Sequence, residues 1–260
     1  MPTARDLTWR LVLDEPRPGA ANMALDHAAA ECLPPGQAVV RLYRWSRPTV
    51  SFGRNEPAAP VTPVAGAAAA AVDYVRRPTG GRAVLHDDEL TYAVVAPLDA
   101  FGGLRQAYLA INRALADALA SLGAEAEIAG EDAAVAGRAL PPDAGPCFQN
   151  PAHGEIVSRG RKLVGSAQAR LEGALLQHGS LLIGGDQRPL GAVPGELEPI
   201  TLRELLGEVD AGDVAGAVTA AMRGRFGGVW VDGTWDERER DVADRLESSR
   251  YGNDAWTWRR

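Results

Sequence analysis

Three short segments with β-strand character follow one another between Gly154 and Ile183, separated by turns of two or three residues. Turns this short join antiparallel neighbours, because a parallel crossover needs a dozen or more residues. This region therefore restricts the fold to one built around an antiparallel sheet. The three expected strands are Glu155–Ser158, Lys162–Arg170 and Ala174–Ile183.

The rest of the chain mixes helices and strands without a regular strand–helix–strand order. We expect helices over about Ala20–Leu33, Val64–Ala71, Leu104–Leu122, Thr201–Leu206, Asp213–Arg225 and Asp236–Ser249. We expect strands over Leu7–Asp14, Ala38–Trp45, Thr49–Gly53, Val72–Arg77, Glu89–Ala96 and Gly228–Val231. The segment Thr49–Gly53 is expected to pair as a hairpin with the strand before it. This mixture predicts an α+β fold, with a mixed, largely antiparallel sheet flanked by helices. A Gly/Pro-rich link before residue 200 predicts a main domain over 1–190 and a small C-terminal helical subdomain over 200–260.

Composition excludes several classes of protein. The net charge of −7 gives no overall basic surface for nucleic acid. The longest uncharged stretch, Pro57–Val72, is shorter than the ~20 apolar residues of a membrane span. Neither a dinucleotide-binding G-x-G-x-x-G after a strand nor a phosphate-binding G-x-x-x-x-G-K-[ST] occurs, and no His or Cys has metal-ligand spacing. We expect a cytoplasmic monomer that holds no metal and binds neither nucleic acid nor a membrane.

Lys162 is the single lysine among 27 basic residues. A GC-rich genome explains the excess of arginine but not the exception. Arginine and lysine exchange freely on a solvated surface, but not where a compact, titratable ammonium is needed. Lys162 is therefore a candidate functional residue, although one leftover exposed lysine is the simpler alternative.

Cys147 lies fifteen residues before Lys162, in a loop that follows several Pro and Gly residues. A thiol beside an ammonium has a lowered pKa, and the thiolate can attack an activated acyl group. The alternative is a small buried apolar residue, which is the common fate of a free cysteine. Cys32, on the apolar face of an Ala-rich helix, is expected to be such a residue.

A turn rich in arginine and glycine covers Arg76–Arg82 and is followed by His86. Paired glycines let a ligand approach the backbone, whose N–H groups can hold an oxyanion or phosphate together with arginine side chains. A hairpin with a solvated basic rim is the alternative. His86 and His178 are expected to form hydrogen bonds rather than bind a metal, although a Cys147–His178 thiol-hydrolase pair is conceivable.

Four motifs occur in order between about residue 8 and residue 184: Asn22–Asp26, Val75–Asp87, Gly160–Gln168 and Gln177–Leu182. Together they resemble the biotin/lipoate A/B protein ligase family. The Pro78–Arg82 turn, Glu89–Tyr92 and the Cys147-Phe148 pair resemble its octanoyltransferase branch, called LipM. The ATP-dependent lipoate ligases of the family usually carry a third glycine where this chain has Arg82, and they lack the cysteine.

The resemblance implies the fold of the biotin and lipoate ligase catalytic domain. It implies transfer of octanoyl from octanoyl-acyl carrier protein to a lysine of a lipoyl domain, such as the glycine-cleavage H protein, without a cofactor. Cys147 matches the acyl-thioester cysteine of the family, and Lys162 matches the lysine that lowers the thiol pKa. The substrate-binding residues implied are Arg77, Gly80, Gly81, His86, Gly165, Ser166, Ala167 and His178.

Backbone N–H groups around Gly165–Ala167 are expected to hold the oxyanion of the reaction. A basic rim of Arg44, Arg47, Arg76 and Arg82 is expected to attract acidic partner proteins. Two other functions compete with acyl transfer: a lipoate–protein ligase that uses Mg-ATP through a lipoyl-adenylate, and a catalytically idle acyl- or lipoate-binding protein.

Overall fold

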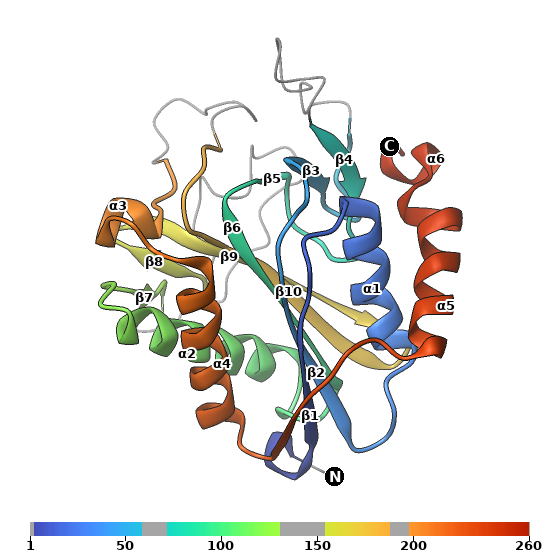
Figure 1. Cartoon of the computed structure of the whole chain (residues 1–260), viewed down its shortest axis with the longest axis horizontal. Helices are drawn as coiled ribbons and strands as arrows, with labels where there is room; N and C mark the ends of the chain where they lie inside the picture. Colours follow the sequence, from blue (N-terminus) through green and yellow to red (C-terminus); the bar gives the residue numbers. More distant parts are fainter. Residues whose placement is uncertain (1–2, 59–71, 131–153, 188–197, 260) are drawn as a thin grey trace.

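The computed structural model describes residues 3–58, 72–130, 154–187 and 198–259 (Figure 1). The helices are η1 (Ala4–Asp6, 3-10), α1 (Gly19–Glu31), α2 (Leu104–Ser121), α3 (Leu202–Leu206), α4 (Ala211–Phe226), α5 (Glu237–Leu246), the π-helix η4 (Glu247–Tyr251) and α6 (Asp254–Thr257). The strands of the large sheet are β1 (Thr8–Leu13), β2 (Gln37–Tyr43), β6 (Glu89–Pro97), β7 (Glu127–Ile128), β8 (Ile156–Ser158), β9 (Arg161–Leu171), β10 (Ala174–Leu182) and β11 (Val229–Asp232). The small sheet contains β3 (Thr49–Phe52), β4 (Asp73–Arg76) and β5 (Val84–His86).

The large sheet has the order β11-β1-β2-β6-β10-β9-β8-β7. Its two pairings at the β11 edge are parallel, and the others are antiparallel. The predicted hairpin region forms β8, β9 and β10, whose tight turns place Arg159 and Glu172 at positive φ. The expected α+β fold with a mixed, largely antiparallel sheet is confirmed.

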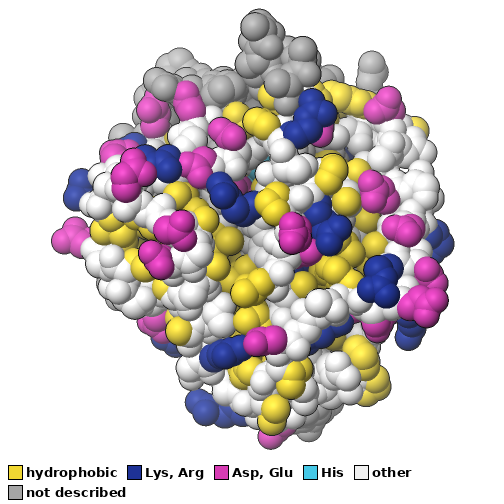
Figure 2. Space-filling view, viewed as in Figure 1, with side chains coloured by type: hydrophobic (Ala, Val, Ile, Leu, Met, Phe, Trp, Pro, Cys, Tyr) yellow, Lys and Arg dark blue, Asp and Glu magenta, His cyan; other side chains and the backbone are white. Residues whose placement is uncertain are grey.

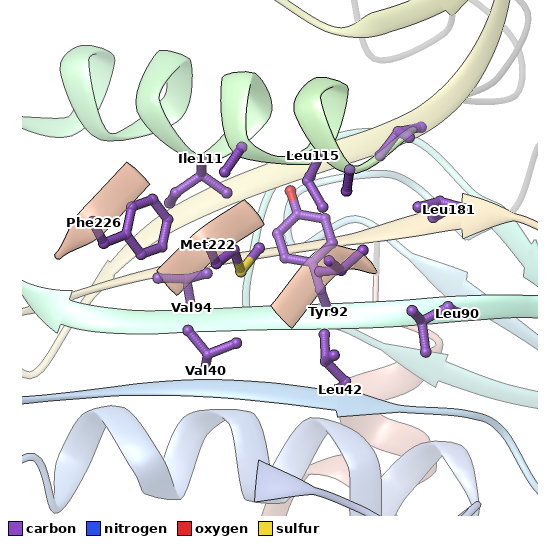
Figure 3. Packing of buried hydrophobic residues seen from close by; sticks show 14 of the residues in the cluster. Val40, Leu42, Leu90, Tyr92, Val94, Ile111, Leu115, Leu181, Met222 and Phe226 are labelled. Carbon is purple, nitrogen blue, oxygen red and sulfur yellow. The ribbon is translucent and has the colours of Figure 1, made fainter. Parts of the chain in front are cut away.

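Both faces of the large sheet are buried, so alternate residues of one strand enter different hydrophobic clusters. Tyr92 and Val94 of β6 face α2 and α4, whereas Ala93 and Val95 face the opposite side with α1 and α5. Figure 1 shows α2 and α4 lying together on one side of the sheet and α1 beside α5 on the other. The α2/α4 core is drawn in Figure 3, where Leu115 lies close to the aromatic ring of Tyr92.

The connection that follows β2 differs from the prediction. The predicted hairpin between the second and third strands is wrong, because β3 pairs with β4 and β5 instead. Both edges of β2 are already occupied by β1 and β6. After β2 the chain also bonds to the segment before α1, with Ser46 N donating to Arg17 O at 3.0 Å. The predicted helix Val64–Ala71 lies outside the described residues.

The C-terminal part of the chain contributes to the same sheet. β11 pairs in parallel with β1 at the edge, and α4 and α5 pack on α2 and α1 respectively. The helix α5 begins with a capping box in which Asp236 and Glu239 each accept the other's backbone N–H. The division into 1–190 and 200–260 stays a prediction.

A core substitution on α2 tests this packing. Leu115 is fully buried, whereas Leu104 on the same helix is 40% exposed. We expect Leu115→Ala to lower the free energy of unfolding by about 2–5 kcal/mol, because it leaves a cavity as well as losing apolar burial. We expect a much smaller loss for the matched control Leu104→Ala. Urea unfolding followed by circular dichroism measures both, and equal losses would contradict the packing described here.

Candidate functional site

A pocket opens where the small sheet meets β6, β9 and β10 of the large sheet, against α1. About 390 Å³ of space between atoms lies in it, counting the solvent at its mouth. We call it the main pocket. Its lining residues are Met23, Tyr43, Trp45, Ser51, Arg77, Val84, His86, Thr91, Gly165, Ser166, Ala167, His178, Gly179 and Ser180.

The fold brings six of the eight predicted substrate-binding residues to this pocket: Arg77, His86, Gly165, Ser166, Ala167 and His178. Gly80 and Gly81 belong to the adjoining turn and do not line it. Lys162 lies on β9, three residues before the lining stretch of that strand. Cys147 lies outside the described residues. The substrate-binding roles stay predictions.

A buried carboxylate holds one wall of the main pocket. Asp26 on α1 is 1% exposed. One oxygen accepts from Arg41 Nη1 at 2.7 Å, and the other accepts from Tyr43 Oη and His178 Nδ1, both at 2.9 Å. The other ring nitrogen of His178, Nε2, lies 2.6 Å from the hydroxyl of Thr79. Thr79 belongs to the turn over Arg76–Arg82, which we call the glycine turn. One carboxylate therefore joins α1 to β2 and β10, and through His178 to the turn.

Burial and the neighbouring donors shift the pKa of Asp26 in opposite directions. Burial alone raises the pKa of Asp26, but the hydrogen bond from His178 and the charge of Arg41 outweigh it and hold that pKa below its ordinary value. Burial lowers the pKa of His178, although Asp26 opposes this shift. His178 is then neutral at pH 7, donating from Nδ1 to Asp26 and accepting at Nε2 from Thr79. Because both ring nitrogens are engaged, His178 has a positioning role in this geometry.

His86 belongs to a second hydrogen-bond chain on the opposite wall. Its Nδ1 lies 2.8 Å from Glu89 Oε1, and its Nε2 lies 2.7 Å from Ser51 Oγ. The buried carboxylate also accepts from Ser180 Oγ at 2.8 Å and from Trp45 Nε1 at 3.1 Å. The ring of Trp45 stacks on that of His86 with 3.9 Å between centroids. These contacts fix both rings at the pocket surface.

A third chain supports Ser166 of β9. Its hydroxyl lies 2.7 Å from Tyr92 Oη and donates to Asn112 Oδ1 at 3.1 Å. Gln177 Nε2 donates to Tyr92 Oη at 2.9 Å, and Asn112 Nδ2 donates to Gly154 O at 2.6 Å. Burial raises the pKa of Tyr92, so its phenol is neutral. Asn112 therefore connects Ser166 in the pocket wall to Gly154, two residues before β8.

Arg77 lines the main pocket and also stabilises the glycine turn through hydrogen bonds to its backbone. Its guanidinium donates to the carbonyls of Ser51, Gly80 and Arg82 at 2.7–3.1 Å. Gly81 has a φ of +89°, and a Cβ there would lie 2.8 Å from Arg77 Nη2. A Cβ at Gly53 would lie only 1.8 Å from Gly81 O. Glycine is thus required at both positions because two backbone segments and a guanidinium meet there.

Lys162 forms a buried ion pair next to the β9 wall. Its Nζ donates to Glu155 Oε1 at 2.7 Å, and the two residues are 2% and 4% exposed. The residue before Glu155, Gly154, is held by Asn112 and by a backbone bond to Ala129 O at 2.8 Å. The sequence identified Lys162 but missed Glu155, although a buried ammonium requires a carboxylate partner.

The predicted basic rim is wrong. Arg76 is fully buried and Arg82 is 7% exposed. Arg44 pairs with Asp88 at 3.2 Å, and Arg47 pairs with Asp73 at 3.4 Å. Figure 2 shows acidic and basic side chains interspersed over the face that it draws. A run of arginines in the sequence does not show whether carboxylates or carbonyls surround each one in the fold.

Sequence reasoning missed Arg41 and Asn112, which hold the walls of the main pocket. It placed Asp26, Thr79, Glu89 and Tyr92 in motifs but gave them no role. Asn112 gave one usable signal, since an amide stands on the otherwise apolar face of α2 beside Ile111 and Leu115. Cys32 is buried, as expected. Within the described residues no three His, Cys, Asp or Glu side chains form a group that could hold a metal ion. None of the described helices has both the length and the apolar character needed to cross a membrane.

Replacing Asp26 tests the shared carboxylate. We expect Asp26→Asn to lower the free energy of unfolding by about 1–3 kcal/mol at pH 7, because Arg41 keeps its ion pair with Asp14 but the hydrogen bonds that Arg41, Tyr43 and His178 donate to the carboxylate are weakened or lost. The folded-state pKa of Asp26 lies below its ordinary value of about 3.9, so the wild-type advantage is complete above that pH and fades as pH falls through the folded-state pKa. Chemical unfolding between pH 7 and pH 2 measures the difference, and an advantage independent of pH would contradict this assignment.

Comparisons with known proteins agree with this architecture. The lipoyl protein ligase A/B catalytic domain family matches residues 18–199. Octanoyltransferase LipM of Kyrpidia tusciae is 35% identical over 97% of this chain and 99% of its own. Octanoyltransferase LipM of Symbiobacterium thermophilum is 34% identical over 98% of this chain and 100% of its own.

A solved structure of a bi-partite lipoate protein ligase from Thermoplasma acidophilum superposes with a TM-score of 0.75, over 97% of this chain and 96% of that one, at 22% identity. That likeness confirms the expected ligase fold. The family match covers every residue that lines the main pocket and the strands from β2 to β10. The chain belongs to the lipoyl protein ligase A/B catalytic domain family.

Proposed function

We propose that this protein moves an octanoyl group from octanoyl-acyl carrier protein to a lysine of a lipoyl domain, such as the glycine-cleavage H protein, through a thioester on Cys147. The observation that carries the proposal is similarity along nearly the whole chain to proteins named octanoyltransferase LipM. The arrangement of the main pocket supports it, and so does the burial of the single lysine.

The lining of the main pocket suits an acyl chain that ends in a reactive carbonyl. Met23, Tyr43, Trp45 and Val84 supply apolar surface, while the polar groups of His86 and His178 are tied to protein partners. An alkyl chain gains from burial against such surface, because it removes apolar area from water and leaves no polar group unsatisfied.

Strand β9 offers backbone donors for the oxyanion. β8 pairs with β9 only as far as Val164, and β10 covers the other edge from Val164 to Leu171. Beyond Val164, within the described residues, alternate N–H groups on the β8 side of the strand therefore have no strand partner. Donors of this kind near Gly165–Ala167 would stabilise the negative charge of a tetrahedral intermediate.

Lys162 supplies the positive charge that the reaction needs. Its ammonium lies in a buried ion pair with Glu155. Cys147 precedes Glu155 by eight residues, and eight extended residues span up to about 26 Å, so the chain permits a contact with Lys162. An ammonium next to the thiol lowers the thiol pKa and raises the fraction of thiolate at neutral pH.

Two acyl substitutions, each at the carbonyl carbon of a thioester, then complete the transfer. The Cys147 thiolate attacks the carbonyl of the donor thioester, the bond to the carrier sulfur breaks, and the carrier thiolate leaves and takes a proton. The neutral amine of the acceptor lysine attacks the octanoyl-Cys147 thioester and loses a proton, and the Cys147 thiolate leaves. The thioester bond already carries the activation, so no step consumes ATP.

An assay without ATP tests the proposal. Purified protein, octanoyl-acyl carrier protein and a lipoyl domain are incubated with EDTA and without ATP. A parallel sample receives Mg-ATP and free octanoate or lipoate in place of the donor and EDTA, and the acceptor is followed by mass spectrometry in both. We expect octanoylation of the acceptor by the wild type and none by Cys147→Ala, with Cys32→Ala as the matched control that retains activity. Modification that requires ATP and free octanoate or lipoate, and that survives in Cys147→Ala, would instead indicate a ligase.

Charge at Lys162 gives a second prediction. We expect Lys162→Met to slow alkylation of Cys147 at pH 7 by about tenfold or more, because a neighbouring charge shifts a pKa by about 1–3 units. The double variant Glu155→Gln/Lys162→Met removes both charges without leaving either one unpaired, and it should be equally slow. The alkylated Cys147 peptide is measured by mass spectrometry across pH. Wild-type profiles in both variants would contradict the proposed role. Lys162→Arg should impair acylation, so wild-type turnover in that variant would contradict the role as well.

A further inference from the structure

A second pocket opens beside β4, between the loop that follows β3 and the C-terminal end of the chain. Figure 1 shows α6, near the C-terminus, lying next to β4. About 580 Å³ of space between atoms lies in this pocket, counting the solvent at its mouth, and its lining residues are Arg54, Asn55, Glu56, Arg76 and Arg259. We call it the arginine pocket. Among the described residues, none lines both this pocket and the main pocket.

Arg76 is the fixed part of the arginine pocket. It is fully buried, and the atoms that accept its hydrogen bonds are all backbone carbonyl oxygens. These acceptors belong to Gly53, Glu56, Trp256, Thr257 and Arg259, at 2.5–3.1 Å. Carbonyl oxygens satisfy N–H groups but do not neutralise a cation, so the charge of Arg76 is offset here only through space, by the nearby Glu56 carboxylate.

Arg54 and Arg259 are held close to each other despite their equal charges. The guanidinium carbon of Arg259 lies 3.7 Å from the ring centroid of Trp256, and Nη2 of Arg259 donates to Arg54 O. The backbone N–H of Arg54 donates to Thr79 O at 2.8 Å. Burial and the charges of Arg54 and Arg250 lower the pKa of Arg259. An anion would relieve this repulsion.

The carboxylate of Glu56, the acidic residue that lines the arginine pocket, makes no direct contact with the guanidinium groups of the three arginines. Both oxygens of Glu56 accept backbone N–H groups, from Gly53 and Ala83, each at 2.9 Å. Within the described residues no carboxylate pairs with Arg54, Arg76 or Arg259, and the sequence from 57 to 72 contains no charged residue. Elsewhere in this chain of net charge −7, many arginines do pair with carboxylates.

We propose that the arginine pocket binds a phosphate group, and that in the reaction this is the phosphate of the pantetheine arm that carries the acyl thioester. Guanidinium groups recognise phosphate oxygens through paired N–H donors and keep their charge when partly buried. The phosphate could also belong to a nucleotide. The choice of the arm rests on the proposed function, because that reaction uses a thioester donor and no ATP.

The place of the pocket in the fold supports this choice. Arg76 is followed directly by Arg77, which lines the main pocket. Thr79 accepts the N–H of Arg54 on one side and contacts His178 of the main pocket on the other. The turn over Arg76–Gly81 therefore separates the two pockets, so that an arm anchored by its phosphate on one side could place its thioester on the other.

Binding to the full-length protein tests the site without catalysis. Pantetheine 4′-phosphate, ATP and inorganic sulfate are titrated calorimetrically at fixed ionic strength. We expect pantetheine phosphate to bind, and Arg54→Ala/Arg259→Ala to weaken it by about tenfold or more through loss of charge-assisted hydrogen bonds. The matched control is Arg105→Ala/Arg238→Ala, which removes two exposed arginines elsewhere and should change the affinity less than about twofold. Equal affinity in the two double variants would overturn the site, and binding of ATP but not of pantetheine phosphate would overturn the choice of ligand.

Turnover separates this inference from the proposed function. In Arg54→Ala/Arg259→Ala we expect the KM for octanoyl-pantetheine phosphate to rise with little change in kcat, and the KM for octanoyl-pantetheine without the phosphate to stay at the wild-type value. A loss of kcat for both donors would overturn the inference, because it would indicate a purely structural role. Arginine-dependent binding of phosphate in a protein that transfers no octanoyl group would uphold the site and overturn the proposed function instead.

Discussion

The carboxylate of Asp26 is the contact on which the main pocket depends. It is buried on α1, and Arg41 of β2, Tyr43 of β2 and His178 of β10 all donate to it. Removing a charge from water is costly, so this arrangement persists only because the partners satisfy both carboxylate oxygens. His178 then extends the contact to Thr79 of the glycine turn. Helix, sheet and turn are thereby fixed around one cavity.

Charge is distributed unevenly around that cavity. Inside it, His86 and His178 are fixed by buried carboxylates, and the remaining lining is apolar or uncharged apart from Arg77. The cations suited to chemistry or binding lie beyond its walls, at Lys162 on β9 and in the arginine pocket behind the glycine turn. Under the proposed function, an acyl chain would lie against the apolar part of this lining, and the charged parts of the donor would meet the cations at its edges.

Local patterns in the sequence predicted much of this fold. The tight turns around β9 and the apolar period of α2 indicated those elements, since neighbours along the chain decide them. The sheet to which β3 belongs could not be predicted in this way, because its partners β4 and β5 lie far along the chain. The occupied edges of β2 also appear only in the assembled sheet.

The sequence predicted which residues belong to the site better than it predicted which partners they contact. Lys162 was identified because it is unique in the chain, but its pairing with Glu155 depends on the register of β8 and β9. Arg76 and Arg77 stand side by side in the sequence and have different surroundings, one enclosed by carbonyls of the C-terminal residues and the other at the main pocket. A contact that spans more than 180 residues leaves no local signal.

The proposed mechanism requires a covalent octanoyl thioester at Cys147, and trapping that species is its most direct test. Purified protein is mixed with octanoyl-acyl carrier protein in the absence of ATP and acceptor, quenched in acid, and examined by intact-mass spectrometry and peptide mapping. The account predicts one octanoyl group per chain on Cys147, released by neutral hydroxylamine and lost when a lipoyl domain is added before the quench. An unmodified protein that nevertheless octanoylates the acceptor, or an octanoyl group on any other residue that passes to it, would contradict the account.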